Sequence, residues 1–504
     1  MPQSGGARMD PGSVGDASEA STGHERTVRE RYMLRLGYRS LKLRISSMRE
    51  CADERIKGLP SFDPCLSPGR TGRPEVVVSD DQAPLLQHPP ADVAREESGA
   101  FVPTGSKPFL GRGSMLSSVF NLSSAALGAG ILALPYAVCQ SGIVLGLIFL
   151  AVAAYVTMFS IQLLVRCRDE TRLSTYEDLA VLCFGKRLSV IVDVSIILFC
   201  FGTCVAYIVA AYDIVSPIVR DIFPNHPVLF AKPTIMITVV TTIMFPLSLV
   251  DKMSSLRFPS FIGVLSICYL VFAVVCDSAY TVVTKGVPPL SPYLIRMHWS
   301  CFRSISIIMF AFTCQVNVFS IYTELQRPSI RRIKKIVRRS TLITFSLYVM
   351  IGLFGFLRNL DSTQPDILYN YSLLQNPLIG VGQLAMGVTV ALAFPFNVYP
   401  CRFTIEMSLF ADSRPSKSRF NIITAAIVFS ALAIAIFVPS LDRVFSLLGS
   451  TTSAFVSFVL PALFYRKIFP GPWQRPDRLA ATCLLVAGAA VGIIGTAVDV
   501  FNIS

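Results

Sequence analysis

The sequence predicts an all-α integral membrane protein with about eleven transmembrane helices. Of its 504 residues, 52% are hydrophobic and only 15% are charged, whereas about a quarter of the residues in a soluble domain carry charge. The apolar residues form long runs, most of them close to the roughly 20 residues that a helix needs to cross a bilayer. The candidate spans are residues 116–138, 142–165, 189–212, 233–250, 258–284, 301–323, 340–357, 378–398, 420–438, 443–464 and 479–499.

The basic residues that make up the net charge of +13 fall mainly in alternate loops. If the N-terminus is cytosolic, a single inner loop holds Arg327, Arg331, Arg332, Lys334, Lys335, Arg338 and Arg339. All the outer loops together hold Arg220, Lys232, Lys285, Arg296, Arg358 and Arg443. Because Lys- and Arg-rich loops stay in the cytosol, this pattern predicts a multi-pass protein with a cytosolic N-terminus, and nucleic acid is not an expected partner. A glycosylation tripeptide, Asn370-Tyr371-Ser372, falls in a predicted outer loop.

Residues 1–110 are predicted to be a separate cytosolic region, followed by a transporter domain at 111–504. No apolar segment typical of a signal peptide occurs in this region. Residues 1–25 and 58–110 are rich in Pro, Gly, Ser and Asp and are expected to be disordered. Between them lies a candidate basic amphipathic helix near 28–50. Its apolar face would be formed by Leu34, Tyr38, Leu41, Ile45 and Met48.

The amphipathic helix has three open interpretations: it binds an anionic membrane surface, it binds a partner protein, or it is a solvated helix with no partner. A second short motif, with Asp81, Leu85 and Leu86, resembles an acidic dileucine sorting signal. That resemblance implies a sorting adaptor as a partner, and traffic toward endosomes, lysosomes or vacuoles.

No pattern in the chain predicts catalysis. The four histidines lie outside the candidate spans, so a histidine proton relay within the membrane is not expected. The sequence contains no P-loop, no serine-hydrolase pattern and no C-x-x-C spacing. We therefore expect no enzyme activity, no cofactor and no metal site.

The first span carries the most informative string, NLSSAALGAGILALPYA (121–137), in which Gly128, Gly130 and Pro135 interrupt an apolar run. An opened helix in hydrocarbon must find partners for its freed N–H and C=O groups, so it survives only when it is buried in protein or lines a cavity. The alternative is a kinked helix that packs closely through its small residues.

Two later spans also hold polar residues near their centres. Span six carries Thr313, Cys314, Gln315 and Asn317, and span eight carries Gln383, Thr389, Pro395, Asn397 and Pro400. Such residues either face a cavity or form hydrogen bonds between helices. Spans one and six are five apart, as are the broken helices of transporters built from two inverted repeats, whose half-helix N-termini bind anionic groups. Span six lacks a central Gly or Pro, so its break is inferred from the polar cluster alone.

Four segments resemble the amino acid/auxin permease family: 121–137, FAFTCQVNVFSIYTELQRPS (310–329), FPFNVYPCR (394–402) and residues 438–467. The resemblance implies a LeuT-like fold with a five-plus-five inverted repeat and secondary active transport of amino acids. It implies a substrate site on the opened parts of spans one and six. With Asn121 and Ser124, which share a helix face with Gly128, the candidate substrate-binding residues are Asn121, Ser124, Ala126, Leu127, Gly128, Ala129, Gly130, Phe312, Thr313, Cys314 and Gln315.

The prediction of the coupling ion rests on one place where this sequence differs from the sodium-coupled members of the family that it resembles. Sodium-coupled members use an asparagine that matches Asn121, and a threonine shortly before the proline-containing segment of span eight. Here residues 391–394 before Pro395 are Ala-Leu-Ala-Phe, and Thr389 is the nearest hydroxyl. Proton coupling is therefore the preferred prediction, and the ion-coupling candidates are Asn121, Thr389, Asp193 and Asp213. The outer loop at 358–377 also lacks a cysteine for the disulfide of the family.

The predicted function is proton-coupled symport of amino acids by alternating access, in the plasma membrane or in a vacuolar or endolysosomal membrane. Three alternatives remain open. They are an amino-acid sensor of the same fold that signals through its N-terminal region, a sodium-coupled carrier and a facilitative carrier.

Overall fold

The computed structural model describes residues 113–501, apart from 174, 227, 229–230, 250–256, 287–288, 372–376, 411–415 and 473–474. Every regular element in these described residues is a helix. The candidate helix near 28–50, the motif with Asp81, Leu85 and Leu86, and Ser372 of the glycosylation tripeptide lie outside them.

Nine helices in the described residues are long and apolar enough to cross a membrane, and one bent pair passes the same test as a unit. The nine are α4 (Ile143–Thr171), α6 (Lys186–Ile222), α9 (Arg257–Lys285), α10–α11 (Ser300–Ala311 and Gln315–Glu324), α12 (Ile330–Asn359), α13 (Pro377–Leu409), α14 (Lys417–Phe437), α15–α16 (Leu441–Leu448 and Leu460–Ile468) and α17 (Pro476–Val500). The bent pair is α2 (Met115–Ala126) and η2–α3 (Ala129–Ala133 and Leu134–Ser141), which meet at 50°. The segment predicted as span four is a shorter apolar helix, α7–α8 (Lys232–Val239 and Phe245–Ser248).

Large apolar side chains cover the outer faces of the long helices. Val152 of α4, Leu265 of α9 and Ile493 of α17 are 54%, 59% and 72% exposed. A soluble protein rarely exposes such residues in the middle of helix after helix, whereas lipid tails solvate them. The apolar outer surface therefore indicates a multi-pass membrane protein.

Several predicted boundaries were wrong, because helices continue beyond their most apolar runs. The eighth predicted span ends at residue 398, but α13 runs on to Leu409. The basic run expected in the loop before residue 340 forms the first turns of α12, which begins at Ile330. Ser329 caps this helix, since its hydroxyl accepts the Arg332 N–H at 3.3 Å. The third predicted span ends at residue 212, but α6 runs on to Ile222.

The bundle has two ends, named here after the short elements that mark them. At the α5 end, α5 (Tyr176–Phe184) joins α4 to α6 through Gly185, which has a φ of +83° that favours glycine. At the opposite η7 end, the connection from α12 to α13 holds two short 3-10 helices, η6 (Leu360–Ser362) and η7 (Ile367–Asn370).

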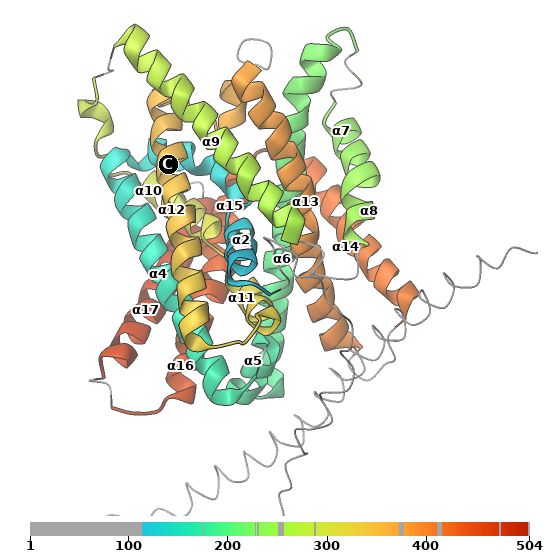
Figure 1. Cartoon of the computed structure of the whole chain (residues 1–504), viewed down its shortest axis with the longest axis vertical. Helices are drawn as coiled ribbons and strands as arrows, with labels where there is room; N and C mark the ends of the chain where they lie inside the picture. Colours follow the sequence, from blue (N-terminus) through green and yellow to red (C-terminus); the bar gives the residue numbers. More distant parts are fainter. Residues whose placement is uncertain are drawn as a thin grey trace, which may run out of the picture. The chain divides into compact units, whose positions relative to one another are not determined.

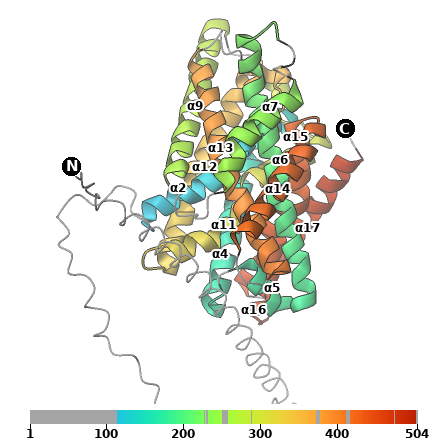
Figure 2. The same ribbon diagram turned by 90° about the vertical axis from the view of Figure 1, so that its right-hand side faces the viewer.

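The helices pack so that the bent pair lies in the interior of the bundle. α13 runs beside α6 and α9, and α12 packs against α9, α4 and both halves of the bent pair. Figure 1 shows α2 among α11, α12 and α9. On the outside, α7 lies against α6 and α14 (Figure 2). This arrangement brings the break in the first span next to α6, α10 and α12.

Candidate functional site

The first break lies between Ala126, where α2 ends, and Ala129, where η2 begins. Gly128 between them is extended, with φ −79° and ψ −154°. Two tyrosines satisfy the polar groups that the break frees. The Tyr348 hydroxyl of α12 donates to the Ala126 carbonyl at 2.6 Å, and the Tyr207 hydroxyl of α6 is hydrogen-bonded to the Ala129 backbone. The opened segment is thus buried in protein, as a break within a membrane requires.

The second break lies between Ala311, the last residue of α10, and Gln315, the first residue of α11. The Gln315 side chain accepts the Cys314 N–H at 2.9 Å, and the Thr313 hydroxyl donates to the Met309 carbonyl at 2.8 Å. Polar side chains here take the place of helical hydrogen bonds. The interruption predicted from the polar cluster of span six, without Gly or Pro, is therefore confirmed.

The two breaks touch each other. A Cβ atom placed on Gly130 would lie 3.1 Å from Cα of Ala311, which is tighter than most real contacts, so glycine permits this approach. On the other side, the Tyr348 hydroxyl lies within hydrogen-bond distance of the Ala126 and Ala311 carbonyls, at 2.6 and 2.8 Å. The first and sixth predicted spans consequently form one continuous wall.

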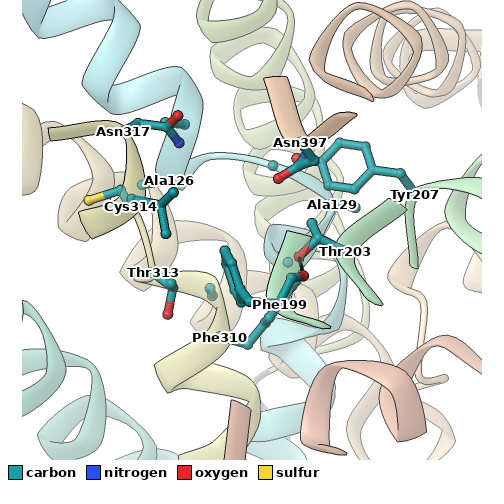
Figure 3. A pocket seen from close by; sticks show the side chains of 15 residues that line it. Ala126, Ala129, Phe199, Thr203, Tyr207, Phe310, Thr313, Cys314, Asn317 and Asn397 are labelled. Carbon is teal, nitrogen blue, oxygen red and sulfur yellow. Dashed lines mark hydrogen bonds between the residues drawn. The ribbon is translucent and has the colours of Figure 1, made fainter. Parts of the chain in front are cut away.

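A cavity opens along this wall, with about 410 Å³ of empty space when its opening is included. Figure 3 shows side chains from both breaks, α6 and α13 around it. Its lining residues are uncharged: Ala125, Ala126, Gly128, Ala129, Gly130, Phe199, Thr203, Tyr207, Phe310, Ala311, Thr313, Cys314, Val316, Asn317 and Asn397.

Polar groups converge on the cavity from different elements. Asn317 of α11 and Asn397 of α13 lie on opposite sides (Figure 3). The Asn397 amide is hydrogen-bonded to the Tyr207 hydroxyl. The aromatic rings of Phe199 and Phe310 lie next to each other in the cavity wall, with their centroids 6.3 Å apart. A mostly apolar cavity with a few fixed polar groups is typical of a small-molecule binding site.

The candidate substrate residues divide into two groups. Those that line the cavity are Ala126, Gly128, Ala129, Gly130, Thr313 and Cys314. Those that do not line it are Asn121, Ser124, Leu127, Phe312 and Gln315. Phe312 instead packs edge-on against the Tyr348 ring, with centroids 4.9 Å apart, and Gln315 caps the second break. Substrate contact by either group stays a prediction.

The four ion-coupling candidates do not all come together in one place. Asp193, in the half of α6 nearer the α5 end, accepts a hydrogen bond from Ser408 at 2.9 Å, and Asp213 accepts one from Tyr369 of η7 at 2.7 Å. Thr389 donates to the Ala385 carbonyl at 2.9 Å. The Asn121 Oδ1 atom is buried without a hydrogen-bond partner. Within the described residues, no group of three His, Cys, Asp or Glu side chains is placed to hold a metal ion.

Sequence reasoning did not assign nine lining residues to the site: Ala125, Phe199, Thr203, Tyr207, Phe310, Ala311, Val316, Asn317 and Asn397. A signal was present for Asn317 and Asn397, which are polar residues inside predicted spans. Phe199, Thr203 and Tyr207 also gave one, since they recur every four residues and therefore share one face of α6. Which neighbour that face meets depends on tertiary packing.

The loop that carries η7 packs near the first break at one end of the bundle. η7 packs against η2 and α6, and its residues Ile367 and Leu368 are fully buried. The Leu368 carbonyl accepts a hydrogen bond from Gln383 of α13 at 3.1 Å. None of the η7 residues lines the cavity; η7 reaches the first break through its packing against η2, the 3-10 helix that begins there.

Burial also affects a carboxyl group in this loop. Asp366 is 1% exposed, and its Oδ1 accepts the Leu368 N–H at 2.8 Å while its Oδ2 has no hydrogen-bond partner. The main cause is burial, and the second is the nearby Asp213; together they raise the pKa of Asp366 well above its usual value. The folded loop therefore binds a proton that the unfolded chain releases above about pH 3.9.

We expect the purified protein to lose stability as the pH rises above about 4, because the native pKa of Asp366 exceeds the unfolded one. Asp366→Asn mimics the protonated form, so this variant should gain stability relative to the wild type, and the gain should grow with pH. Thermal unfolding midpoints measured across pH test this. Asp361→Asn is the control, because Arg296 lowers the pKa of Asp361 and this exposed group should show no such gain. Parallel pH profiles for wild type and Asp366→Asn would contradict the assignment.

The fold and the cavity define a class of protein: a multi-pass helical membrane protein whose two interrupted helices border one small-molecule cavity, as in membrane transporters. The model of the family described as "Transmembrane amino acid transporter protein" matches residues 111–501. The chain belongs to this family, which is the amino acid/auxin permease family that the sequence motifs resemble.

Two relatives match over most of their lengths. A Danio rerio protein, provisionally named sodium-coupled neutral amino acid transporter 11, is 28% identical over 389 residues, covering 76% of this chain and 86% of the relative. Vacuolar amino acid transporter 5 of Schizosaccharomyces pombe is 27% identical over 409 residues, covering 78% of this chain and 96% of the relative.

Proposed function

We propose that this protein is a proton-coupled amino acid symporter that binds its substrate in the cavity between the two breaks. The observation that carries the proposal is the meeting of two interrupted helices at one cavity, in a chain that belongs to an amino acid transporter family. In the proposed architecture, eleven helices form a LeuT-like five-plus-five inverted repeat. The α5 end faces the cytosol, in a plasma or vacuolar/endolysosomal membrane.

The first break supplies the groups that would hold the substrate carboxylate. η2 and α3 together form a half-helix that begins at Ala129. Its first N–H groups have no partner within the helix, and Tyr207 is hydrogen-bonded to the backbone of Ala129 beside them. The helix dipole favours an anion at this end. Tyr207 and Asn397 add polar groups beside it. The uncharged amides and hydroxyls of Asn317, Thr313 and Thr203 would then face the rest of the substrate.

Alternating access would expose this cavity to one side at a time. The lining includes residues of α2 and α11, the half-helices that lead toward the α5 end, while the η7 loop packs against η2 at the other end. We therefore interpret the structure as a state closed toward the outside. Spans one, two, six and seven would move against a scaffold built mainly on spans three, four, eight and nine.

For coupling, we propose a proton, because residues 391–394 hold no threonine. A sodium ion is the second candidate. The buried, unpartnered Asn121 Oδ1 favours it, and so does the proximity of Ser124 and Thr389, which both approach the same face of Gly263.

Uptake of labelled amino acids into proteoliposomes tests the proposal. We expect uptake to rise when the external solution is acidified and to persist when choline replaces sodium. One pH unit supports about tenfold accumulation per co-transported proton. Strict sodium dependence, with a raised sodium requirement in Asn121→Ala, would contradict proton coupling. Counterflow without accumulation would indicate a facilitative carrier, and binding without flux would indicate a sensor.

A further inference from the structure

One buried hydroxyl group contacts the open ends of both broken helices. Tyr348 of α12 is fully buried, and its hydroxyl lies 2.6 Å from the carbonyl of Ala126 and 2.8 Å from the carbonyl of Ala311. These two residues are the last of α2 and of α10. Carbonyls at helix ends have no partner within their own helix. The Ala126 carbonyl also accepts the Gly128 N–H at 2.8 Å, and the phenol adds a donor that the ends of both helices share.

The single proton of a phenol cannot make two full hydrogen bonds at once. Tyr348 therefore shares its proton between the two carbonyls or alternates between them. Either arrangement requires the ends of α2 and α10 to stay close together. The ring is held in place by its edge-on contact with Phe312, inside the second break.

The remainder of α12 follows the first broken span from one half to the other. The Ser340 hydroxyl lies 3.0 Å from that of Ser123 in α2. Beyond the break, a Cβ atom on Gly352 would lie 3.3 Å from Val138, and one on Gly355 would lie 2.8 Å from Pro135, both in α3. Residues 340, 348, 352 and 355 share one helix face. This unbroken helix thus supports the broken one, and Tyr348 extends that support to the second break.

We propose that Tyr348 is a positioning residue that ties both breaks to α12, so that the two walls of the cavity keep their spacing and move as one unit. The inference rests on the proposed function, because its consequence is measured as amino acid uptake. Without the hydroxyl, two buried carbonyls lose their shared donor, and each wall shifts without the other. Substrate affinity and turnover should therefore fall together.

The test is Tyr348→Phe, which keeps the ring and removes the hydroxyl. Loss of a hydrogen bond to a buried carbonyl predicts about a tenfold lower Vmax/KM for amino acid uptake, with a raised KM. Tyr176→Phe is the matched control, because the buried Tyr176 hydroxyl has no hydrogen-bond partner, so uptake should be unchanged. Ser340→Ala removes a bond between α12 and α2 alone, and we expect a smaller loss without a raised KM.

Replacement of Tyr348 by 4-aminophenylalanine returns N–H donors to the same position and should restore uptake and KM. Wild-type kinetics in Tyr348→Phe would overturn the proposal. So would equal losses in Tyr348→Phe and Ser340→Ala with KM unchanged, which indicate packing alone. If Tyr348→Phe does not fold, the 4-aminophenylalanine variant decides. A 4-aminophenylalanine variant that folds but does not take up amino acids would also overturn the proposal. Absence of amino acid uptake by the wild-type protein is a different result, which removes the proposed function itself.

Discussion

Gly128→Val is expected to abolish amino acid uptake while the protein still reaches the membrane. A Cβ atom at this position would lie 1.9 Å from the Tyr207 hydroxyl and 3.0 Å from Cζ of its ring, far closer than atoms can approach. Tyr207 is buried and is hydrogen-bonded to Ala129 and Asn397, so it cannot swing aside without breaking the polar wall of the cavity. The clash lies inside the site, where it displaces the groups proposed to hold the substrate.

Uptake and surface labelling, measured on the same cells, separate transport from expression. Gly471→Val is the control, because the nearest atoms to its Cβ belong to the Arg475 guanidinium at an ordinary 3.5 Å. Normal uptake by Gly128→Val would remove the first break from the site.

Gly449→Ala is expected to destabilise the whole bundle. Its Cβ atom would lie 1.8 Å from the Ser306 carbonyl oxygen, where the π-helical segment η8 (Gly449–Ser453) packs against α10. The obstacle is backbone rather than a flexible side chain, so the two helices must separate. Overpacking in a close-packed interior costs about 1–3 kcal/mol, and sometimes more, and we expect the upper end of this range.

The thermal unfolding midpoint in detergent should therefore fall well below that of the wild type. Gly387→Ala serves as the control, since its Cβ would meet only the Cγ2 methyl group of Ile214, at 3.3 Å. Equal midpoints for the two variants would show that the contact between η8 and α10 relaxes easily.

Much of the architecture follows from local sequence. Long apolar runs predict the helices, and Gly128, Gly130 and Pro135 predict the first break. The second break could be predicted because Thr313 and Gln315 are costly in a membrane helix unless they replace backbone hydrogen bonds, as they do here. Helix ends were less predictable, since a capped, basic segment such as the start of α12 remains helical beyond its apolar part.

Only the part of the candidate site that lies at the two helix breaks could be predicted from the sequence. Tyr207 and Tyr348 come from α6 and α12, which lie far from the breaks in sequence, and nothing local specifies that their hydroxyls meet Ala129, Ala126 and Ala311. The placement of η7 depends likewise on long-range contacts, such as that between Gln383 and Leu368. Tertiary packing decides these contacts.

Protection of an introduced thiol tests most directly whether the transported amino acid binds between the two breaks. Asn317 is half-buried and lines the cavity, and Thr323 lies exposed near the end of the same helix, α11. Alkylation of Asn317→Cys and Thr323→Cys in proteoliposomes is followed by peptide mass spectrometry, with and without a transported amino acid. We predict that the amino acid slows labelling at position 317 and leaves labelling at position 323 unchanged. Unchanged labelling at position 317 at saturating substrate would contradict the placement of the substrate in this cavity.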